Sequence, residues 1–156
     1  MESHKRNISE FNINTGMKGF VLIDRVKEIS QETIFGNSIG LNGFLFKGIE
    51  VLAQFGALHV RYLCDFKSHA FLLKVENCNF FVQSLSEGKI DLEGQLVSKS
   101  QSAFSYDLSA KSDGSIVMSG KFLFAVTNYD SRFKSELLEQ HYKQVYSCLR
   151  NDTKDD

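Results

Sequence analysis

The segment Phe44–Leu63 constrains the fold of this chain more than any other feature. It is long and apolar, but four polar or charged side chains interrupt it: Lys47, Glu50, Gln54 and Arg61. A charged residue near the centre of a bilayer costs about 2.5–3.5 kcal/mol, so the segment is a poor membrane span. We expect instead a long helix buried in a soluble globular protein.

Two glycines within this helix indicate close packing against a sheet. Gly48 and Gly56 each cost about 1 kcal/mol relative to alanine in a helix interior. Apolar side chains surround most of the helix, a pattern typical of a helix that other structure wraps. Small residues at these positions would let the strands approach the helix backbone.

Runs of β-branched and aromatic residues on both sides of the helix predict a sheet. The expected strands are Phe20–Ile29, a short strand at Glu32–Phe35, and then Ala70–Phe81, Lys89–Ser98, Ala103–Lys111 and Ser115–Val126. Asp113-Gly114, between the last two strands, is a strong signal for a two-residue hairpin turn. Gly120 predicts a bulge or a bend where the sheet curves.

The chain is expected to form one domain with short appendages. Residues 1–16 are predicted to be a polar N-terminal arm, 17–128 the domain itself, 129–150 an amphipathic C-terminal helix, and 151–156 a disordered tail. The C-terminal helix is expected from Ser131 to Leu149. Its apolar stripe consists of Phe133, Leu137, Leu138, Tyr142, Val145 and Leu149.

The composition argues against several classes of function. A net charge of −1 provides no basic field for nucleic acid or an anionic membrane. The three cysteines are far apart, which argues against a disulfide framework and a structural zinc site and favours a reduced, cytoplasmic compartment. No apolar run follows the charged N-terminus, so no signal peptide is expected. No metal or nucleotide motif occurs, and neither kind of cofactor is expected.

The order of these elements, together with four short motifs, resembles the 3-hydroxyacyl-acyl-carrier-protein dehydratase family of the hot-dog fold. Phe20–Ile29 is similar to the family's first strand with its Asp-Arg-Val motif. Gly48–Gln54 is similar to the family's helix motif, an acidic residue followed four positions later by glutamine. Phe71–Phe80 and residues 113–125 resemble later strands. The resemblance implies an α+β fold in which a curved antiparallel sheet wraps one central helix.

This resemblance implies an acyl-thioester site at a subunit interface. Such dehydratases remove water from a 3-hydroxyacyl thioester carried on a phosphopantetheine arm, using a histidine base and a carboxyl group. Glu50 matches the carboxyl group and is the predicted catalytic residue, while the predicted substrate-binding residues are Gln54, Asn37, Leu45 and Phe46. The implied partners are acyl carrier protein or an acyl-CoA thioester, and a second hot-dog subunit in a homodimer or a hetero-oligomer.

The catalytic histidine of that family is missing. The family carries it in a loop before the helix, where this chain has Phe35–Gly43 without histidine. The stretch from Asp24 to Glu50 is also shorter than the family's by roughly a strand and a turn. Asn37 or Ser38 could hold substrate by hydrogen bonds, but neither is a base near neutral pH. The histidines elsewhere are expected to be surface or structural residues: His4, His59, His69 and His141.

Glu50 belongs to a stripe along one side of the central helix, formed by Lys47, Glu50, Gln54, Ala57 and Arg61. Such a stripe is either the solvated face of an amphipathic helix or the lining of a substrate tunnel. Lys47 lies about one turn from Glu50. An ion pair between them would suit a structural role better than catalysis.

Three functions remain open on these grounds. The first is a dehydratase-like protein of fatty-acid or polyketide metabolism, weak or inactive alone, that binds acyl thioesters or completes a site with a histidine-bearing partner. The second is an acyl thioesterase in which Glu50 activates water and Asn37 orients the thioester. The third is a non-catalytic interaction subunit. Its tunnel would be closed by Phe35, Phe44, Phe46 and Phe55, and its C-terminal helix would bind a partner through Tyr142, Tyr146 and Leu149.

Overall fold

The computed structural model describes residues 22–41, 45–85, 87–129 and 135–151. These residues form β1 (Arg25–Ile29), β2 (Thr33–Ile39), α1 (Leu45–Leu63), β3 (Ser68–Phe80), β4 (Lys89–Lys99), β5 (Ala103–Ser112), β6 (Ser115–Asn128) and α2 (Ser135–Asn151). α1 and the four strands after it match the predicted elements to within a few residues. The predicted arm at residues 1–16 lies outside the described residues, as does the predicted start of the central helix at Phe44.

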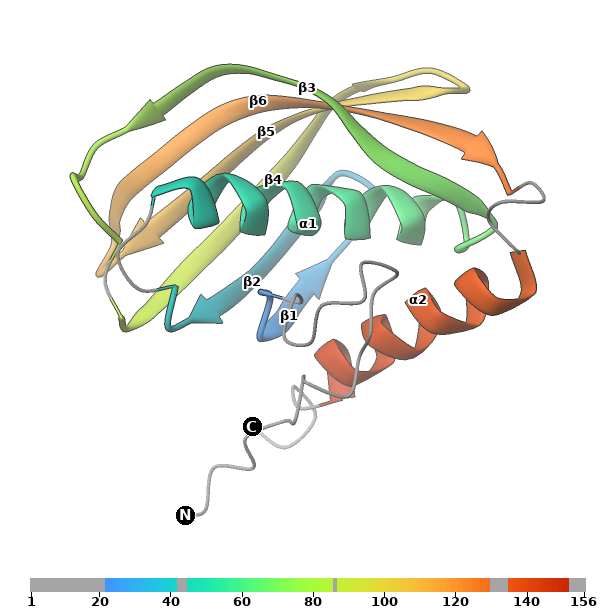
Figure 1. Ribbon diagram of the computed structural model, residues 1–156, viewed down its shortest axis with the longest axis horizontal. Helices are drawn as coiled ribbons and strands as arrows, with labels where there is room; N and C mark the ends of the chain where they lie inside the picture. Colours follow the sequence, from blue (N-terminus) through green and yellow to red (C-terminus); the bar gives the residue numbers. More distant parts are fainter. Residues whose placement is uncertain (1–21, 42–44, 86, 130–134, 152–156) are drawn as a thin grey trace.

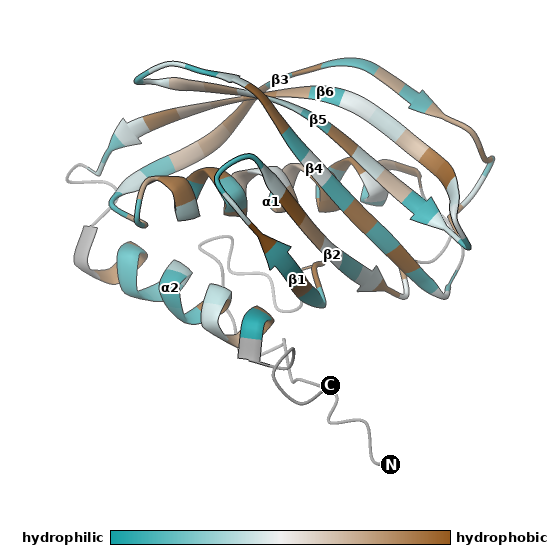
Figure 2. Ribbon diagram, turned by 180° about the vertical axis from the view of Figure 1, so that it is seen from behind, coloured by the Kyte–Doolittle hydropathy of each residue, from teal (hydrophilic) through white to brown (hydrophobic). Residues whose placement is uncertain are grey.

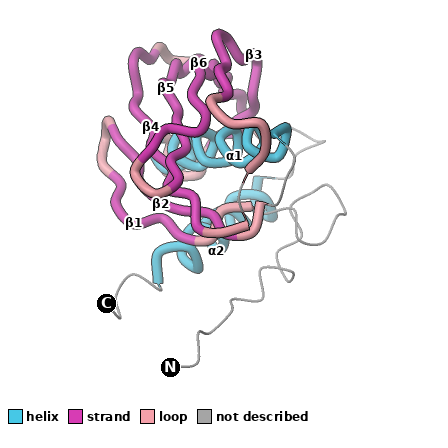
Figure 3. The backbone as a smooth tube through the Cα atoms, turned by 90° about the vertical axis from the view of Figure 1, so that its left-hand side faces the viewer, coloured by secondary structure: helices cyan, strands magenta, loops and turns pink. Residues whose placement is uncertain are grey.

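The six strands form one antiparallel sheet in the order β1-β2-β4-β5-β6-β3. The sheet curves around α1, and α2 lies outside this curve, near β1 (Figures 1 and 3). Hydrophilic and hydrophobic residues alternate along β4 (Figure 2), which turns Ile90 and Leu92 toward α1 and the core. A curved antiparallel sheet around one central helix is the hot-dog fold, so the predicted α+β fold class is confirmed.

The two helix glycines let β6 approach α1 closely, as predicted. A Cβ atom on Gly56 would lie 2.5 Å from Cζ of Phe124, and a Cβ atom on Gly48 would lie 2.7 Å from Cε of Met118. Both distances are shorter than a van der Waals contact between carbon atoms. Side chains of β6 therefore occupy the space that larger residues on α1 would need.

A buried polar group also fixes α1 within the sheet. His59 is fully buried, and its Nε2 donates to the carbonyl oxygen of Ser30 at 2.7 Å. A carbonyl oxygen only accepts, so Nδ1 of the neutral ring accepts from the Tyr106 hydroxyl, also at 2.7 Å. Burial lowers the pKa of His59, although the hydrogen bond to Ser30 acts in the opposite direction. His59 is thus a structural residue, as predicted.

β1 is shorter than the predicted strand Phe20–Ile29. It begins at Arg25, and residues 20 and 21 lie outside the described part of the chain. Just before β1, the backbone N–H of Leu22 donates to the side chain of Gln54 in α1 at 2.9 Å. The backbone N–H of Leu22 is therefore hydrogen-bonded to a side chain of the central helix and not to a neighbouring strand.

β2 is longer than predicted and continues past Phe35 to Ile39, through a segment expected to be a loop. It pairs with β4 over this whole length. Asn37 and Ser38 are buried within it, and the Ser38 hydroxyl donates to the carbonyl oxygen of Leu22. Because the backbone is paired and the hydroxyl is hydrogen-bonded, these polar residues can occupy a buried strand.

The turn between β5 and β6 lies at Asp113-Gly114, as predicted, with φ values of 51° and 81°. Two positive φ values are what a two-residue hairpin turn of this hand requires. Gly120 pairs regularly with Leu108 of β5, but it lies opposite a bulge in β3 near Cys78. A Cβ atom on Gly120 would lie 3.3 Å from the Cα atom of Cys78, so the glycine makes room for that bulge.

α2 packs against its own domain. The buried residues of its apolar stripe are Leu138, Tyr142, Val145 and Leu149. Near its end, Nη1 of Arg150 donates to the carbonyl oxygens of Val26 and Lys27 in β1, at 3.3 Å and 2.7 Å. Two of the three residues that the interaction-subunit hypothesis expected to contact a partner, Tyr142 and Leu149, are therefore already covered within the chain.

Candidate functional site

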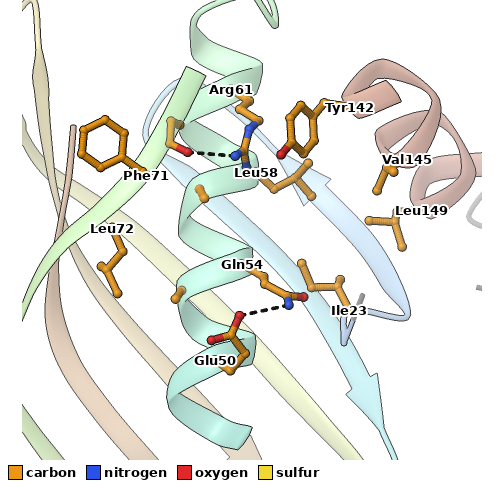
Figure 4. Close-up of a pocket in the computed structure, with 13 residues that line it drawn as sticks. Ile23, Glu50, Gln54, Leu58, Arg61, Phe71, Leu72, Tyr142, Val145 and Leu149 are labelled. Carbon is orange, nitrogen blue, oxygen red and sulfur yellow. Dashed lines mark hydrogen bonds between the residues drawn. The ribbon is translucent and has the colours of Figure 1, made fainter. Parts of the chain in front are cut away.

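A cavity of about 230 Å³ lies between the open side of α1, the start of β3 and α2 (Figure 4). Its lining residues are Ile23; Glu50, Ala53, Gln54, Ala57, Leu58 and Arg61 of α1; Ala70, Phe71 and Leu72 of β3; and Tyr142, Val145 and Leu149 of α2. Every member of the predicted stripe except Lys47 is among them. That side of α1 therefore faces a cavity and is not simply the solvated face of a helix.

Glu50 and Gln54 are joined by a hydrogen bond in this cavity (Figure 4). Nε2 of Gln54 donates to Oε1 of Glu50 at 3.2 Å, while Oε1 of Gln54 accepts from the backbone N–H of Leu22 at 2.9 Å. Because that backbone N–H can only donate, the amide oxygen of Gln54 must face it and the NH₂ group must face Glu50. Gln54 therefore holds the carboxyl group of Glu50 in one orientation.

The surroundings of this carboxyl group suit an aliphatic ligand. Ala53 and Ala57 are small residues on the same side of α1, and Leu58 and Leu72 add apolar surface to the cavity. A carboxylate offers several acceptor positions, so the hydrogen bond from Gln54 leaves acceptor capacity on Glu50. The site can therefore hold an alkyl chain along α1 while Glu50 binds a water or a hydroxyl group at its end.

Arg61 lies at the other end of the cavity lining on α1 (Figure 4). Its Nη2 donates to the carbonyl oxygen of Ala70 in β3 at 2.8 Å, and its Cζ lies 3.9 Å from the centre of the Tyr142 ring. A guanidinium over an aromatic face is a favourable cation–π contact. Burial lowers the pKa of Arg61, while Tyr142 and Tyr129 act in the opposite direction. Arg61 thus joins α1, β3 and α2 around the cavity.

The remaining predicted substrate-binding residues lie elsewhere. Asn37 is 7% exposed within β2, and its carbonyl oxygen accepts from the N–H of Asp24 at 2.9 Å. Leu45 is partly buried in the first turn of α1, and Phe46 beside it is 65% exposed. None of the three lines the cavity that contains Glu50. The contact of Asn37, Leu45 and Phe46 with substrate stays a prediction.

The three described phenylalanines that were expected to close a tunnel do not line this cavity either. Phe55 is fully buried on the other side of α1, where it contacts the sheet at Gly36. Phe35 is partly buried in β2, and Phe46 is exposed. Phe44 lies outside the described residues.

Within the described part of the chain, no histidine lines the cavity. His59 lies in the core, His69 is the second residue of β3 and lies beside the Tyr129 ring, and His141 precedes Tyr142 on α2. His4 lies outside the described residues. The fold therefore does not bring any of the three described histidines to the position that the dehydratase family's base would fill beside Glu50.

Sequence reasoning assigned no role at the site to several residues that line the cavity. Arg61 was on the predicted stripe but had no ligand role, and β3 contributes Ala70, Phe71 and Leu72. Tyr142 belongs to the apolar stripe of the C-terminal helix, which indicated that this helix packs on something. That stripe does not specify which surface it covers, so the cavity between α1 and α2 could not be predicted.

The described residues contain no group of three or more histidine, cysteine, aspartate or glutamate side chains arranged to hold a metal ion. Neither described helix is long and apolar enough to cross a membrane.

No protein-family model matches the sequence, and no curated protein shows significant similarity to it. Solved structures do resemble the fold. A chain of the dehydratase heterocomplex ApeI:P from Xenorhabdus doucetiae aligns with a TM-score of 0.63 and 15% identity, covering 76% of this chain and 89% of that one. A mutant thioesterase from Pseudomonas aeruginosa aligns with a TM-score of 0.58 and 13% identity, covering 67% and 81%.

A hypothetical thioesterase from Streptococcus pneumoniae, solved with coenzyme A, aligns with a TM-score of 0.57 and 14% identity. The alignment covers 69% of this chain and 88% of that one. Dehydratases and thioesterases therefore both occur among the structures similar to this chain. At these identities the similarity establishes the hot-dog fold and does not distinguish the two reactions.

Proposed function

We propose that this protein binds acyl thioesters, with the thioester group beside Glu50 and the acyl chain in the cavity between α1 and α2. The observation that carries the proposal is the oriented carboxyl group at one end of an apolar cavity: Glu50 is held by Gln54, and Gln54 is held by the backbone of Leu22. Structures of the same fold include a thioesterase solved with coenzyme A and a chain of a dehydratase complex.

Hydrolysis is the reaction that these residues can support within one chain. Glu50 would take a proton from a water molecule as that water attacks the thioester carbonyl carbon. The tetrahedral intermediate would then expel the thiolate, breaking the C–S bond, and the thiolate would receive the proton from Glu50. The products are a carboxylic acid and a free thiol, and no cofactor is consumed.

Dehydration by this chain alone is less well supported. Removal of the proton beside a thioester carbonyl needs a base in addition to the group that protonates the departing hydroxyl. Glu50 can fill one of these roles, and none of the described histidines lines the cavity to fill the other. We therefore place hydrolysis ahead of dehydration.

The test is a comparison of acyl-CoA and acyl-carrier-protein substrates with wild type and Glu50→Gln. We expect hydrolysis by wild type and a loss of about a hundredfold or more in Glu50→Gln, as is typical when a general base is removed. Glu93→Gln is the matched control, because Glu93 lies on the outer face of β4 and pairs with Lys111 at 3.1 Å. Equal rates in wild type and Glu50→Gln would rule out Glu50 as the catalyst.

A second candidate is a subunit that shares its site with a histidine-bearing hot-dog partner. β3 lies at the end of the sheet order, with β6 as its only neighbour in the described sheet. Its exposed apolar residues include Phe71 and Leu72, which also line the cavity, and Leu73. A second subunit on this edge would therefore lie beside Glu50.

This candidate predicts 3-hydroxyacyl-thioester dehydration only when the chain is co-expressed with a histidine-bearing hot-dog protein from the same genome. Glu50→Gln in this chain would then abolish the activity of the complex. If a complex forms and its dehydration rate is unaffected by Glu50→Gln, the shared site does not exist.

A further inference from the structure

The two ends of the cavity carry opposite charges. Glu50 and Arg61 both line it and lie on the same side of α1, separated by about 16 Å along the helix axis. Between them the lining from α1 consists of Gln54, which is hydrogen-bonded to Glu50, and of alanine and leucine side chains, with Val145 and Leu149 of α2 opposite. Such a cavity favours a ligand that is apolar along its length and anionic at one end only.

Arg61 is a partly buried cation, and its contacts within the described part of the chain include no carboxylate. Within the described residues, its contacts are the carbonyl oxygen of Ala70 and the ring of Tyr142. Its Nε atom is buried and has no hydrogen-bond partner among the residues that the structure describes. Removing a cation from water costs several kcal/mol unless a counter-charge and hydrogen bonds compensate. A carbonyl and an aromatic ring provide only part of that compensation, so an anion beside Arg61 would supply the counter-charge that its described contacts lack.

We propose that the cavity binds an aliphatic carboxylate, with its carboxylate held by Arg61 and its alkyl chain lying along α1 toward Ala53. A cavity of about 150 Å³ holds the six carbons of benzene, so a cavity of 230 Å³ accommodates roughly nine carbons. Glu50 repels an anion at its own end and so fixes the direction of the ligand. This inference concerns the opposite end of the cavity from the thioester and does not depend on hydrolysis.

The test is calorimetric titration of the full chain with octanoate and with octanol, which have the same chain length and differ in charge. We expect octanoate to bind at least about tenfold more tightly, a difference equivalent to about 1.4 kcal/mol. Arg61→Met should remove this preference while retaining octanol binding. Equal affinities of wild type for the two ligands would overturn the proposal.

Arg150→Met is the matched control, because Arg150 also holds α2, through the carbonyl oxygens of β1, and does not line the cavity. It should keep the preference for octanoate. Equal loss of the preference in Arg61→Met and Arg150→Met would mean that Arg61 only anchors α2, and the proposal would fail. If Arg61→Met does not fold, the comparison of octanoate with octanol on wild type still decides the proposal.

Glu50→Gln separates this proposal from the proposed function. It should abolish thioester hydrolysis and leave octanoate binding intact or tighter, because a negative charge at the far end of the cavity is removed. A wild type that hydrolyses thioesters without preferring octanoate would contradict the carboxylate site alone. A wild type that prefers octanoate but hydrolyses no thioester would contradict the hydrolytic function alone.

Discussion

Gln54 donates to Glu50 with one end of its carboxamide and accepts from the backbone of Leu22 with the other, at 3.2 Å and 2.9 Å. The glutamine thus connects the candidate catalytic carboxyl group to the segment that precedes β1. Four-residue spacing on a helix brings the two side chains together, and the contact with Leu22 determines which end of the carboxamide faces Glu50. Gln54 is therefore a positioning residue for Glu50.

Gln54→Met keeps the length of the side chain and removes both hydrogen bonds. We expect the kcat of thioester hydrolysis to fall about tenfold to a hundredfold with little change in KM, because the carboxyl group loses its fixed orientation. The unpartnered N–H of Leu22 should also lower the free energy of unfolding by about 1–3 kcal/mol. Steady-state kinetics at a temperature well below the Tm of the variant checks the first effect. Gln95→Met on the outer face of β4 is the control and should retain the wild-type kcat.

Gly56 is required by the approach of β6 to α1. In Gly56→Ala the new methyl group would lie 2.5 Å from Cζ of Phe124, whose ring is fully buried. We expect the free energy of unfolding to fall by about 1–3 kcal/mol, even though alanine is the better helix former. Urea denaturation of Gly56→Ala measures the loss. The double variant Gly56→Ala with Phe124→Leu should recover part of it, and no recovery would mean that the clash with Phe124 is not the cause.

Most of the fold could be predicted from the sequence because its elements are marked by local patterns. The apolar segment around α1, the alternation within β4 and the Asp113-Gly114 turn each depend on neighbouring residues alone. The extension of β2 was missed for the opposite reason. Asn37 and Ser38 are polar residues in a buried strand, and the partner of the Ser38 hydroxyl, the carbonyl oxygen of Leu22, is sixteen positions away.

The candidate site could also be predicted only in part from the sequence. Glu50 and Gln54 could be brought together from helical spacing and a family resemblance. The far end of the cavity could not be predicted from the sequence, because Arg61, Ala70 and Tyr142 meet only when α2 folds back onto α1 and β3. Helical periodicity identifies the apolar stripe of α2, but the surface that receives it depends on the three-dimensional packing of the whole domain.

His59 predicts a loss of stability in acid. Burial lowers its pKa below the usual value of about 6.5, so the unfolded chain binds a proton more readily than the folded one. The stabilisation is complete above pH 6.5 and declines as the pH falls below that value, by up to about 1.4 kcal/mol per pH unit. Urea denaturation between pH 7.5 and about pH 5 measures this slope. His59→Gln should be less stable at neutral pH and should show a shallower slope.

His141 contributes to the same slope, because burial and the charge of Arg61 lower its pKa as well. His141→Gln should therefore reduce the slope without removing the contribution of His59. If His59→Gln and wild type lose stability equally between pH 6.5 and pH 5, the buried ring is not responsible. In that case His59 would take up a proton as readily in the folded protein as in the unfolded chain, although a protonated Nδ1 cannot accept the hydrogen bond from Tyr106.

The edge of β3 predicts self-association or pairing with another hot-dog subunit. Leu73 is 54% exposed and is the extra residue of a bulge in this strand. Exposed apolar residues on a sheet edge are favourable in an interface and unfavourable in water. If the edge is the interface, Leu73→Lys should convert an oligomer to a monomer, measured by sedimentation at micromolar concentration. Val97→Lys is the control, since Val97 is 50% exposed on β4, within the sheet. An unchanged oligomer in Leu73→Lys, or equal dissociation in both variants, would place the interface elsewhere.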